Sequence, residues 1–267
     1  MCDYFQYTRA AYYKSLKDHE VESFSEAVVV DMFRQQRRQQ PRIGGKKLYF
    51  MLSSDIHSIN PHLGRNKFFD FLRKNGLLVE RKRQYQKTTN SYHRFHKYGN
   101  KIKELSEISP NQVWASDITY LRTKIGFVYL SLIIDMYSRK IVGWSLCKNL
   151  SIEGPMDALK KALRENSAKK PLIHHSDRGI QYCSHDYVKI LNKNKIEISM
   201  TEENHCYENA KAERLNGILK DEYLLDRTFN DFAHANKACR EAVRLYNICR
   251  PHLALNYKTP EQVYQAA

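Results

Sequence analysis

The spacing of hydrophobic and polar positions changes near residue 110, and this change divides the chain into two parts. In the first part, apolar residues recur every three or four positions, which is the spacing of one buried helix face. The pattern predicts three helices: one that begins at Ser23 or Ser25, one over residues 46–52 and one over residues 65–75. Turn-forming residues separate them, namely Pro41, Gly44-Gly45, Asn60-Pro61 and Gly76.

Beyond residue 110, short apolar runs replace the helical spacing. Three runs follow one another closely, so we expect neighbouring antiparallel strands over residues 113–120, 127–134 and 141–146. Helix-like and strand-like patterns then alternate, with helices over residues 154–164, 187–192, 210–225 and 231–247 and strands over residues 171–175 and 196–200. This order predicts an α/β fold, with a mixed sheet and helices on its faces.

The three predicted N-terminal helices are short, tightly connected and basic at the end, which is typical of a helix-turn-helix unit. In such a unit the second helix of the motif enters the major groove of DNA, led by its N-terminal residues. Candidate DNA-binding residues on the last helix are Arg65, Asn66, Lys67, Arg73 and Lys74. A small helical bundle with a solvated basic face explains the same pattern equally well.

The overall charge favours a polyanionic partner such as nucleic acid, since the formal net charge is +15 and the isoelectric point is near 9.5. The charge is unevenly spread. Residues 1–110 carry 21 Lys and Arg against 11 Asp and Glu, whereas residues 111–267 carry 23 against 18. This asymmetry suggests a DNA-binding front part on a less basic body.

Residues 81–103 contain eight Lys or Arg, no Asp or Glu, and several interleaved aromatic residues. Cations neutralise phosphates and aromatic rings stack on exposed bases, so this segment would contact DNA. Its first three cations, Arg81, Lys82 and Arg83, are the strongest candidates. The ordinary explanation is a solvated linker.

Six cysteines occur without a Cys-x-x-Cys pair, which predicts reduced thiols in a cytoplasmic protein. The chain opens on a polar and aromatic stretch rather than a secretory signal. No apolar run approaches the roughly 20 residues that a membrane-spanning helix needs. A zinc site at His93 and His96 is disfavoured, because no cysteine pair matches it.

Three acidic residues stand where a carboxylate is either costly or well placed for chemistry. Asp117 lies inside an otherwise apolar strand, where an acid is unfavourable unless it is paired or binds a metal ion. Asp177 directly follows a strand, which is a usual position for a site in an α/β sheet. Glu213 lies on a predicted helix. Together their oxygen atoms would suit Mg²⁺ or Mn²⁺.

Each of these acids also has an ordinary structural explanation. A buried arginine partner would account for Asp117, a turn for Asp177 and an exposed helix face for Glu213. Asp135 and Asp157 are competing carboxylates, and sequence spacing alone does not exclude them.

Four strings of residues, in order, carry a family resemblance. They are Trp114-x-x-Asp117-Ile118-Thr119-Tyr120, His175-Ser176-Asp177-Arg178-Gly179-x-Gln181-Tyr182, Asn209-x-x-x-Glu213-Arg214, and Tyr246-Asn247-x-x-Arg250-Pro251-His252-x-Ala254-Leu255 with Thr259-Pro260. With them, residues 111–260 resemble the retroviral-integrase-like core of insertion-sequence transposases, the OrfB product of elements with two overlapping frames. Thirty-five residues separate Asp177 from Glu213, as in the D,D-35-E signature of that group. Residues 8–13 and 41–79 resemble the family's N-terminal region.

The resemblance implies an RNase-H-like fold, a mixed five-stranded sheet flanked by helices, preceded by a small all-α helix-turn-helix domain. It implies a DNA-binding region over residues 1–80, a basic aromatic linker over 81–107 and a catalytic core over 108–267. Asp117, Asp177 and Glu213 would be the catalytic residues and would bind two Mg²⁺ or Mn²⁺ ions. Further DNA contacts are implied at Arg178, Asn209 and Lys220. The family often has a glycine in the loop before Asn209, and residues 202–208 lack one.

The function implied is metal-dependent DNA strand cleavage and strand transfer at insertion-sequence ends. The partners implied are double-stranded element ends and target DNA, further copies of the chain on that DNA, and an upstream-frame protein or fusion. The setting would be the bacterial cytoplasm, at the nucleoid, with no membrane. Two other functions fit the same fold: a catalytically silent DNA-binding regulator and a structure-specific nuclease that does not join strands.

Overall fold

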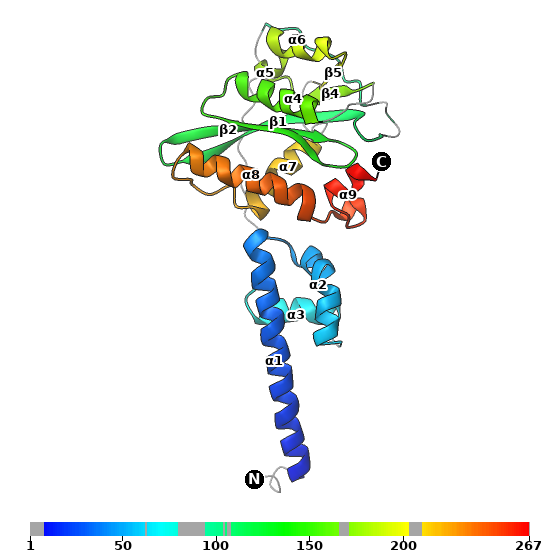
Figure 1. The fold of residues 1–267 in the computed structure, drawn as a ribbon, viewed down its shortest axis with the longest axis vertical. Coiled ribbons are helices and arrows are strands. Elements are labelled where there is room, and N and C mark those ends of the chain that lie inside the picture. Colours follow the sequence, from blue (N-terminus) through cyan, green and yellow to red (C-terminus); the bar gives the residue numbers. More distant parts are fainter. Residues whose placement is uncertain are drawn as a thin grey trace. The chain divides into compact units, whose positions relative to one another are not determined.

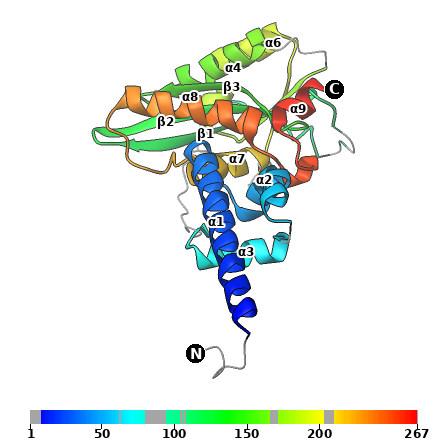
Figure 2. The same ribbon diagram turned by 60° about the horizontal axis from the view of Figure 1, so that its bottom comes forward.

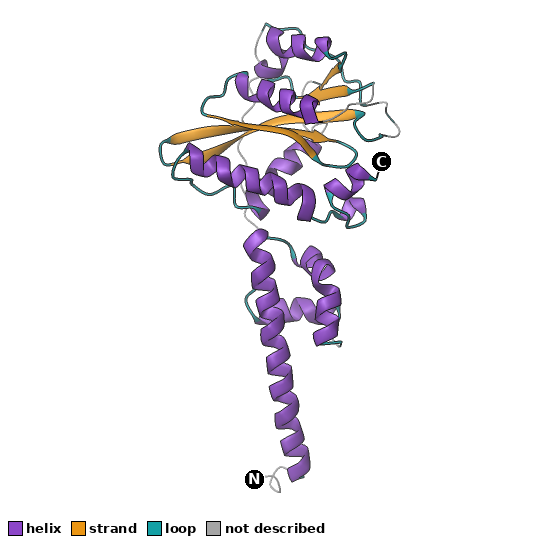
Figure 3. Cartoon of the chain, in the orientation of Figure 1, coloured by secondary structure: helices purple, strands orange, loops and turns teal. Residues whose placement is uncertain are grey.

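The computed structural model describes residues 8–61, 63–79, 94–103, 105, 108–165, 171–202 and 210–266. The chain divides into two compact units, Met1–Glu80 and Arg81–Ala267 (Figure 1). Helices make up the first unit, whereas the second combines helices with all of the described strands (Figure 3). No helix of the described residues is long and apolar enough to cross a membrane.

Three helices form the first unit: α1 (Arg9–Gln39), α2 (Gly45–Ile59) and α3 (Arg65–Lys74). The predicted start of the first helix at Ser23 or Ser25 is wrong, because α1 begins at Arg9, fourteen or sixteen residues earlier. The Thr8 side chain caps it, accepting a hydrogen bond from the Ala11 amide at 3.1 Å. No Gly or Pro interrupts residues 9–39. The described side chains before Phe24 are exposed, so this half lacks the apolar spacing that marks a packed helix.

Aromatic rings form the centre of the first unit's core. The Phe33 ring of α1 lies edge-on to Phe68 and Phe71 of α3, with ring centroids 5.1 and 5.9 Å apart. Leu48 and Ile56 of α2 are fully buried beside them. The buried Ile56 explains why α2 runs seven residues beyond the predicted end, through a polar stretch. The predicted helical N-terminal region is confirmed.

A mixed five-stranded sheet, as the sequence predicts, forms the middle layer of the second unit. Its strands are β1 (Val113–Thr123), β2 (Gly126–Asp135), β3 (Ile141–Cys147), β4 (Ile173–Ser176) and β5 (Glu197–Met200), in the order β3-β2-β1-β4-β5. The first three strands pair antiparallel and the last two join in parallel. β1 pairs with β2 along almost its whole length but with β4 through only three residue pairs.

Helices cover both faces of this sheet (Figure 2). One face packs against α4 (Glu153–Glu165) and α6 (His185–Lys193), and the other against α7 (Ala210–Glu222) and α8 (Phe232–Cys249). Two short helices escaped sequence prediction, α5 (Ile180–Cys183) and α9 (Pro260–Gln265), and a 3₁₀ turn spans Leu253–Leu255. Elements this short are not long enough to show a hydrophobic period.

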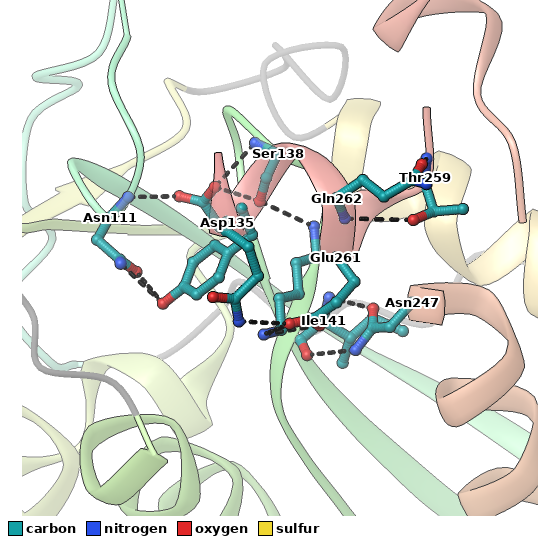
Figure 4. A network of polar contacts seen from close by, with 11 residues as sticks. Asn111, Asp135, Ser138, Ile141, Asn247, Thr259, Glu261 and Gln262 are labelled. Carbon is teal, nitrogen blue, oxygen red and sulfur yellow. Dashed lines mark hydrogen bonds and ion pairs between the residues drawn. The ribbon is translucent and has the colours of Figure 1, made fainter. Parts of the chain in front are cut away.

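The C-terminal segment is fixed to the core by polar contacts. The Asn247 side chain bonds both the amide and the carbonyl of Ile141, at 2.9 and 3.0 Å. Arg250 is almost fully buried and donates to both carboxylate oxygens of Glu222 at 2.8 Å. Helix α9 begins at a capping box formed by Thr259 and Gln262 (Figure 4). Residues 246–260, the last of the four family strings, therefore attach α8 and α9 to the core.

Two glycines of this unit should respond in opposite ways to alanine. A Cβ at Gly143 would collide with the backbone oxygen of Ala158, where α4 lies directly on β3. We expect G143A to lower the free energy of unfolding by about 1–3 kcal/mol through overpacking. Gly217 lies in the middle of α7 with open space around it, so G217A should raise that free energy by about 0.5–1 kcal/mol. Urea unfolding checks both, and equal effects would contradict this packing.

Candidate active site

The short pairing of β1 with β4 determines where the first two carboxylates lie. Ala115 of β1 is in register with His175 of β4, and both strands run in the same direction. Asp117 and Asp177 each come two residues later, so they emerge next to one another where the two strands part. Asp117 is held by two hydrogen bonds. Its Oδ1 accepts from the Ile118 amide at 2.9 Å, and its Oδ2 from the Asn216 side chain at 2.7 Å.

Asp177 begins the turn that leads from β4 into α5. Its Oδ1 accepts a hydrogen bond from the Gly179 amide at 3.0 Å, which is the local bonding of an Asx turn. A Cβ at Gly179 would lie 2.9 Å from that same oxygen. Glycine at this position therefore leaves space beside the Asp177 carboxylate.

Helix α7 brings the third carboxylate to the same edge of the sheet. Glu213 is exposed in the first turn of α7, and Asn216 follows one turn later on the same face. The bond from Asn216 to Asp117 anchors this face of the helix to β1. Leu215 and Leu219 flank it and are buried in the core on the α7 side of the sheet.

The three carboxyl groups are close enough to disturb one another's ionisation. Burial raises the pKa of Asp117 to about 7, and the charges of Asp177 and, to a smaller extent, Glu213 add to this rise. Burial and the charge of Asp177 likewise raise the pKa of Glu213. Bringing three acids together without a neighbouring cation is unfavourable, and a bound cation would relieve the repulsion.

The residues present suit a hard divalent cation. Besides the carboxylates, the side-chain oxygen of Asn216 is buried without a hydrogen-bond partner in the described structure, and so is the hydroxyl of Tyr182. Oxygen ligands of this kind are those that Mg²⁺ and Mn²⁺ prefer. As the described residues stand, no three His, Cys, Asp or Glu side chains are grouped as metal ligands are. Residues 203–209, which lead into α7, lie outside that description.

The competing carboxylates have structural roles instead. Asp135 is fully buried and accepts hydrogen bonds from the amides of Asn111 and Ser138 and from the Ser138 hydroxyl, at 2.6–2.9 Å (Figure 4). Three donors of the protein thus hold it, and the charge that acts on it is that of a cation, Lys211, rather than of another acid. Asp157 is exposed on α4, beside Lys160. Geometry therefore separates these two acids from the three at the β1–β4 junction.

Comparison with known proteins agrees with this geometry. A family model described as integrase core domain matches residues 108–206, and a second model of the same description matches residues 194–260. An uncharacterised 31 kDa protein of insertion element IS600 from Shigella sonnei is 32% identical over 265 residues, which are 97% of this chain and 96% of that protein. The chain belongs to the integrase-core family of insertion-sequence transposases.

Two further proteins are similar to part of this chain. The transposase InsF of insertion sequence IS3A from Escherichia coli K12 is 38% identical over 154 residues, which cover 57% of this chain and 54% of that transposase. A simian T-cell lymphotropic virus intasome, solved by cryo-electron microscopy with a PP2A regulatory subunit, aligns with a TM-score of 0.53 and 19% identity. That alignment covers 84% of this chain and 75% of the viral chain, and it shows a shared fold.

The DNA-binding candidates of this transposase fall into different settings. Lys220 is partly buried, with its ammonium group 4.5 Å from the centre of the Tyr120 ring, and burial lowers its pKa. Arg178 is partly buried next to Asp177. On α3, Arg65, Asn66 and Lys67 are exposed, whereas Arg73 and Lys74 pair with Asp70 and Glu26. Four candidates lie outside the described residues, namely Arg81, Lys82, Arg83 and Asn209.

A buried polar cluster behind the carboxylates was missed by sequence reasoning. His174 of β4 lies 2.6 Å from the Ser116 hydroxyl of β1 and 2.9 Å from the Tyr187 hydroxyl of α6. Burial lowers the pKa of His174 to about 3, so the ring is neutral and its Nε2 lies within hydrogen-bond distance of both hydroxyls. A histidine pair within an apolar strand was the available signal, because a histidine buried there needs partners.

The raised pKa of Asp117 predicts an unusual dependence of stability on pH. The folded protein holds this proton up to about pH 7, whereas an unfolded aspartic acid releases it near pH 4. Folding stability of the metal-free transposase should therefore fall as pH rises from about 4 to 7. D117N removes the charge and retains the hydrogen-bond acceptor.

We expect D117N to be more stable than the unaltered chain at pH 8, by up to roughly 4 kcal/mol, and nearly equal at pH 4. Urea unfolding in a chelator at several pH values measures this difference. D157N, at an exposed carboxylate, is the control and should show no such trend. A D117N variant less stable at pH 8 than at pH 4, relative to the unaltered chain, would refute the assignment.

Proposed function

We propose that Asp117, Asp177 and Glu213 are the catalytic carboxylates with which this transposase cleaves and joins DNA strands at insertion-sequence ends. The observation that carries the proposal is their meeting at the β1–β4 junction, where the register brings Asp117 beside Asp177. The raised pKa values of Asp117 and Glu213 support it, since burial and the charge of Asp177 raise both. Acids held together at such a cost are typical of functional sites.

The same three residues would hold the divalent cations that this chemistry needs. Two Mg²⁺ or Mn²⁺ ions, when bound, would activate the attacking oxygen and stabilise the leaving oxygen of an in-line displacement at phosphorus. The chain itself orients the carboxylates. Asn216 fixes one oxygen of Asp117, and the Gly179 amide fixes one oxygen of Asp177. The fold thus orients the carboxylates of Asp117 and Asp177 before any ligand binds.

The remaining parts of the chain would recognise and hold DNA. The exposed residues Arg65, Asn66 and Lys67 begin α3, as expected of a helix that leads into the major groove. We assign DNA binding to residues 1–80, catalysis to residues 108–267 and a basic linker to residues 81–107. Arg178 and Lys220 would contact the DNA near the reacting phosphate, with Asn209 and the cations Arg81, Lys82 and Arg83.

Assembly belongs to the same proposal. Cutting and joining need two element ends and a target in one complex, so we infer that several copies of the chain act together on DNA. A fusion with an upstream-frame protein would add further DNA-binding surface to each copy. The cell compartment that follows from these partners is the bacterial nucleoid.

Substitution of the carboxylates tests the catalytic assignment. With Mg²⁺ and a labelled duplex that carries the element end, D177N and E213Q should each lower 3′-end cleavage and strand joining by roughly a thousandfold, equivalent to about 4 kcal/mol. Binding of the same duplex in a chelator should persist in both variants. D157N supplies a matched control in which activity is retained.

The outcomes separate the possible functions. Full activity of D177N or E213Q would overturn the proposed mechanism. Cleavage without joining, at saturating target DNA, would identify a nuclease instead of a transposase. DNA binding without metal-dependent cleavage in the unaltered chain would identify a silent regulator.

The α3 assignment makes a separate prediction about specificity. R65Q or K67Q should weaken binding to the element end more than to an unrelated duplex, because residues at the start of such a helix contact base edges. Each loss should amount to about 1–3 kcal/mol for a base-contacting residue. R73Q is the comparison, since Arg73 pairs with Asp70 in the last turn, and it should change binding less. Competition titrations measure the ratio, and equal losses for both duplexes would contradict the assignment.

A further inference from the structure

The β1–β2 hairpin extends well beyond the short strands β4 and β5. β4 pairs with Val113–Ala115 alone, so the part of β1 from Asp117 to Thr123 continues past it. Near the hairpin end, the segment around Phe229 lies along β1. The Phe229 amide bonds the Arg122 carbonyl, and the Lys124 amide bonds the Phe229 carbonyl, both at 2.9 Å. The hairpin end is therefore fixed to the core and presents a defined surface.

Two aromatic rings of this hairpin lie between two cations, Lys220 of α7 and Arg122 of β1. The ammonium group of Lys220 lies 4.5 Å from the centre of the Tyr120 ring. Tyr120 packs edge-on against Phe127 of β2, with ring centroids 5.2 Å apart. The guanidinium of Arg122 lies 5.8 Å from the centre of the Phe127 ring. We call these four residues the cationic ladder.

The ladder begins directly at the catalytic carboxylates. Lys220 follows Asn216 by one turn of α7, and Asn216 donates to Asp117. The charge of Asp117 also acts on Lys220, where it opposes the lowering of the lysine pKa by burial. A ligand bound along the ladder would thus have one end beside the reacting centre.

The cations of the ladder differ from two other ring-bound cations of this protein, Arg250 and Lys140. Arg250 lies over Tyr246 and Lys140 over Tyr264, but each is also neutralised by a glutamate at 2.8 Å. Among the described residues, no carboxylate forms an ion pair with Arg122 or Lys220. The rings hold these two cations in place and leave their charge available to an anion.

We propose that the cationic ladder binds the phosphate backbone of the DNA strand that leads away from the reacting phosphate. This inference rests on the proposed function, since it takes DNA to be the substrate. Cations held on ring faces retain N–H donors for phosphate oxygens, and guanidinium matches phosphate geometry especially well. Base stacking is a poorer fit, because the ladder's rings already carry the cations.

Backbone binding of this kind ignores base sequence. Such contacts position a duplex without reading it, which suits DNA whose sequence differs from one insertion site to the next. The same chemistry would hold either the flank of the element end or the target duplex. Ile125 and Lys124, exposed at the hairpin tip, would lie at the far end of the bound strand.

Salt-dependent binding of the full chain tests the ladder. A fluorescent duplex with the element end and an unrelated duplex of equal length are titrated in a chelator, at several salt concentrations. R122Q should weaken binding several-fold and reduce the slope of log affinity against log salt by about one, as for loss of one phosphate contact. F127A keeps the charge but removes the ring, so it should weaken binding with little change in slope.

R164Q is the control, because Arg164 is an exposed arginine that belongs to α4 and takes no part in the ladder. It should leave both affinity and slope near those of the unaltered chain. Loss in R122Q on the element-end duplex alone would assign the ladder to the donor, and loss on both duplexes would assign it to any DNA. Either result supports the ladder.

Two results distinguish failure of the ladder from failure of the proposed function. If R122Q binds both duplexes like R164Q while the unaltered chain cuts and joins DNA, the ladder is wrong and the transposase mechanism stands. If R122Q shows the expected loss but D177N still cuts DNA, the ladder stands and the carboxylate mechanism is wrong. Unfolding midpoints of R122Q and F127A, measured alongside, should match the unaltered chain within error, since Arg122 and Phe127 are exposed.

Discussion

The parallel register between β1 and β4 is the constraint on which the rest of the site depends. Three residue pairs set it, and they end at Ala115 and His175. Asp117 and Asp177, two of the proposed catalytic residues, come two residues later, beyond the last paired residues of the two strands. Antiparallel β1–β2 pairing makes the sheet rigid, but it does not place any of the three acids next to another. The connection from β3 through α4 places β4 beside β1, and this brings Asp177 next to Asp117.

Placing the acids together has an energetic cost that the core must offset. Asp117 and Glu213 both resist ionisation, mostly through loss of water and partly through neighbouring charge. A site of this kind is destabilised when empty and stabilised when filled by cations, so ligand binding and folding are linked. The packed faces of α7 and α8 supply the apolar burial that makes such a site tolerable.

The sheet could be predicted from sequence because its strands are apolar runs bounded by turns, and predicted strand ends fall within three residues of those observed. The start of α1 could not be predicted, since its described side chains before Phe24 are exposed and show no hydrophobic period. The pattern of apolar and polar residues could not decide between Asp117 and Asp135 either. Both acids end or interrupt apolar strands, and only the structure reveals three donors on Asp135 and a neighbouring acid for Asp117. Family motifs favour Asp117 without giving a physical reason for the choice.

The buried contact among Ser116, His174 and Tyr187 has a consequence for how the sheet assembles. A slip of two residues between β1 and β4 would keep every side chain on its own face of the sheet, so hydrophobic patterning alone would tolerate it. The slip would nevertheless carry Asp177 about 6.6 Å along the strand, since each residue advances roughly 3.3 Å. The slip would also separate the neutral imidazole of His174 from its hydroxyl partners and leave it unpaired in the apolar core, at a cost of about 1–3 kcal/mol. The buried contacts of His174 with Ser116 and Tyr187 thus favour the one register that places Asp117 beside Asp177.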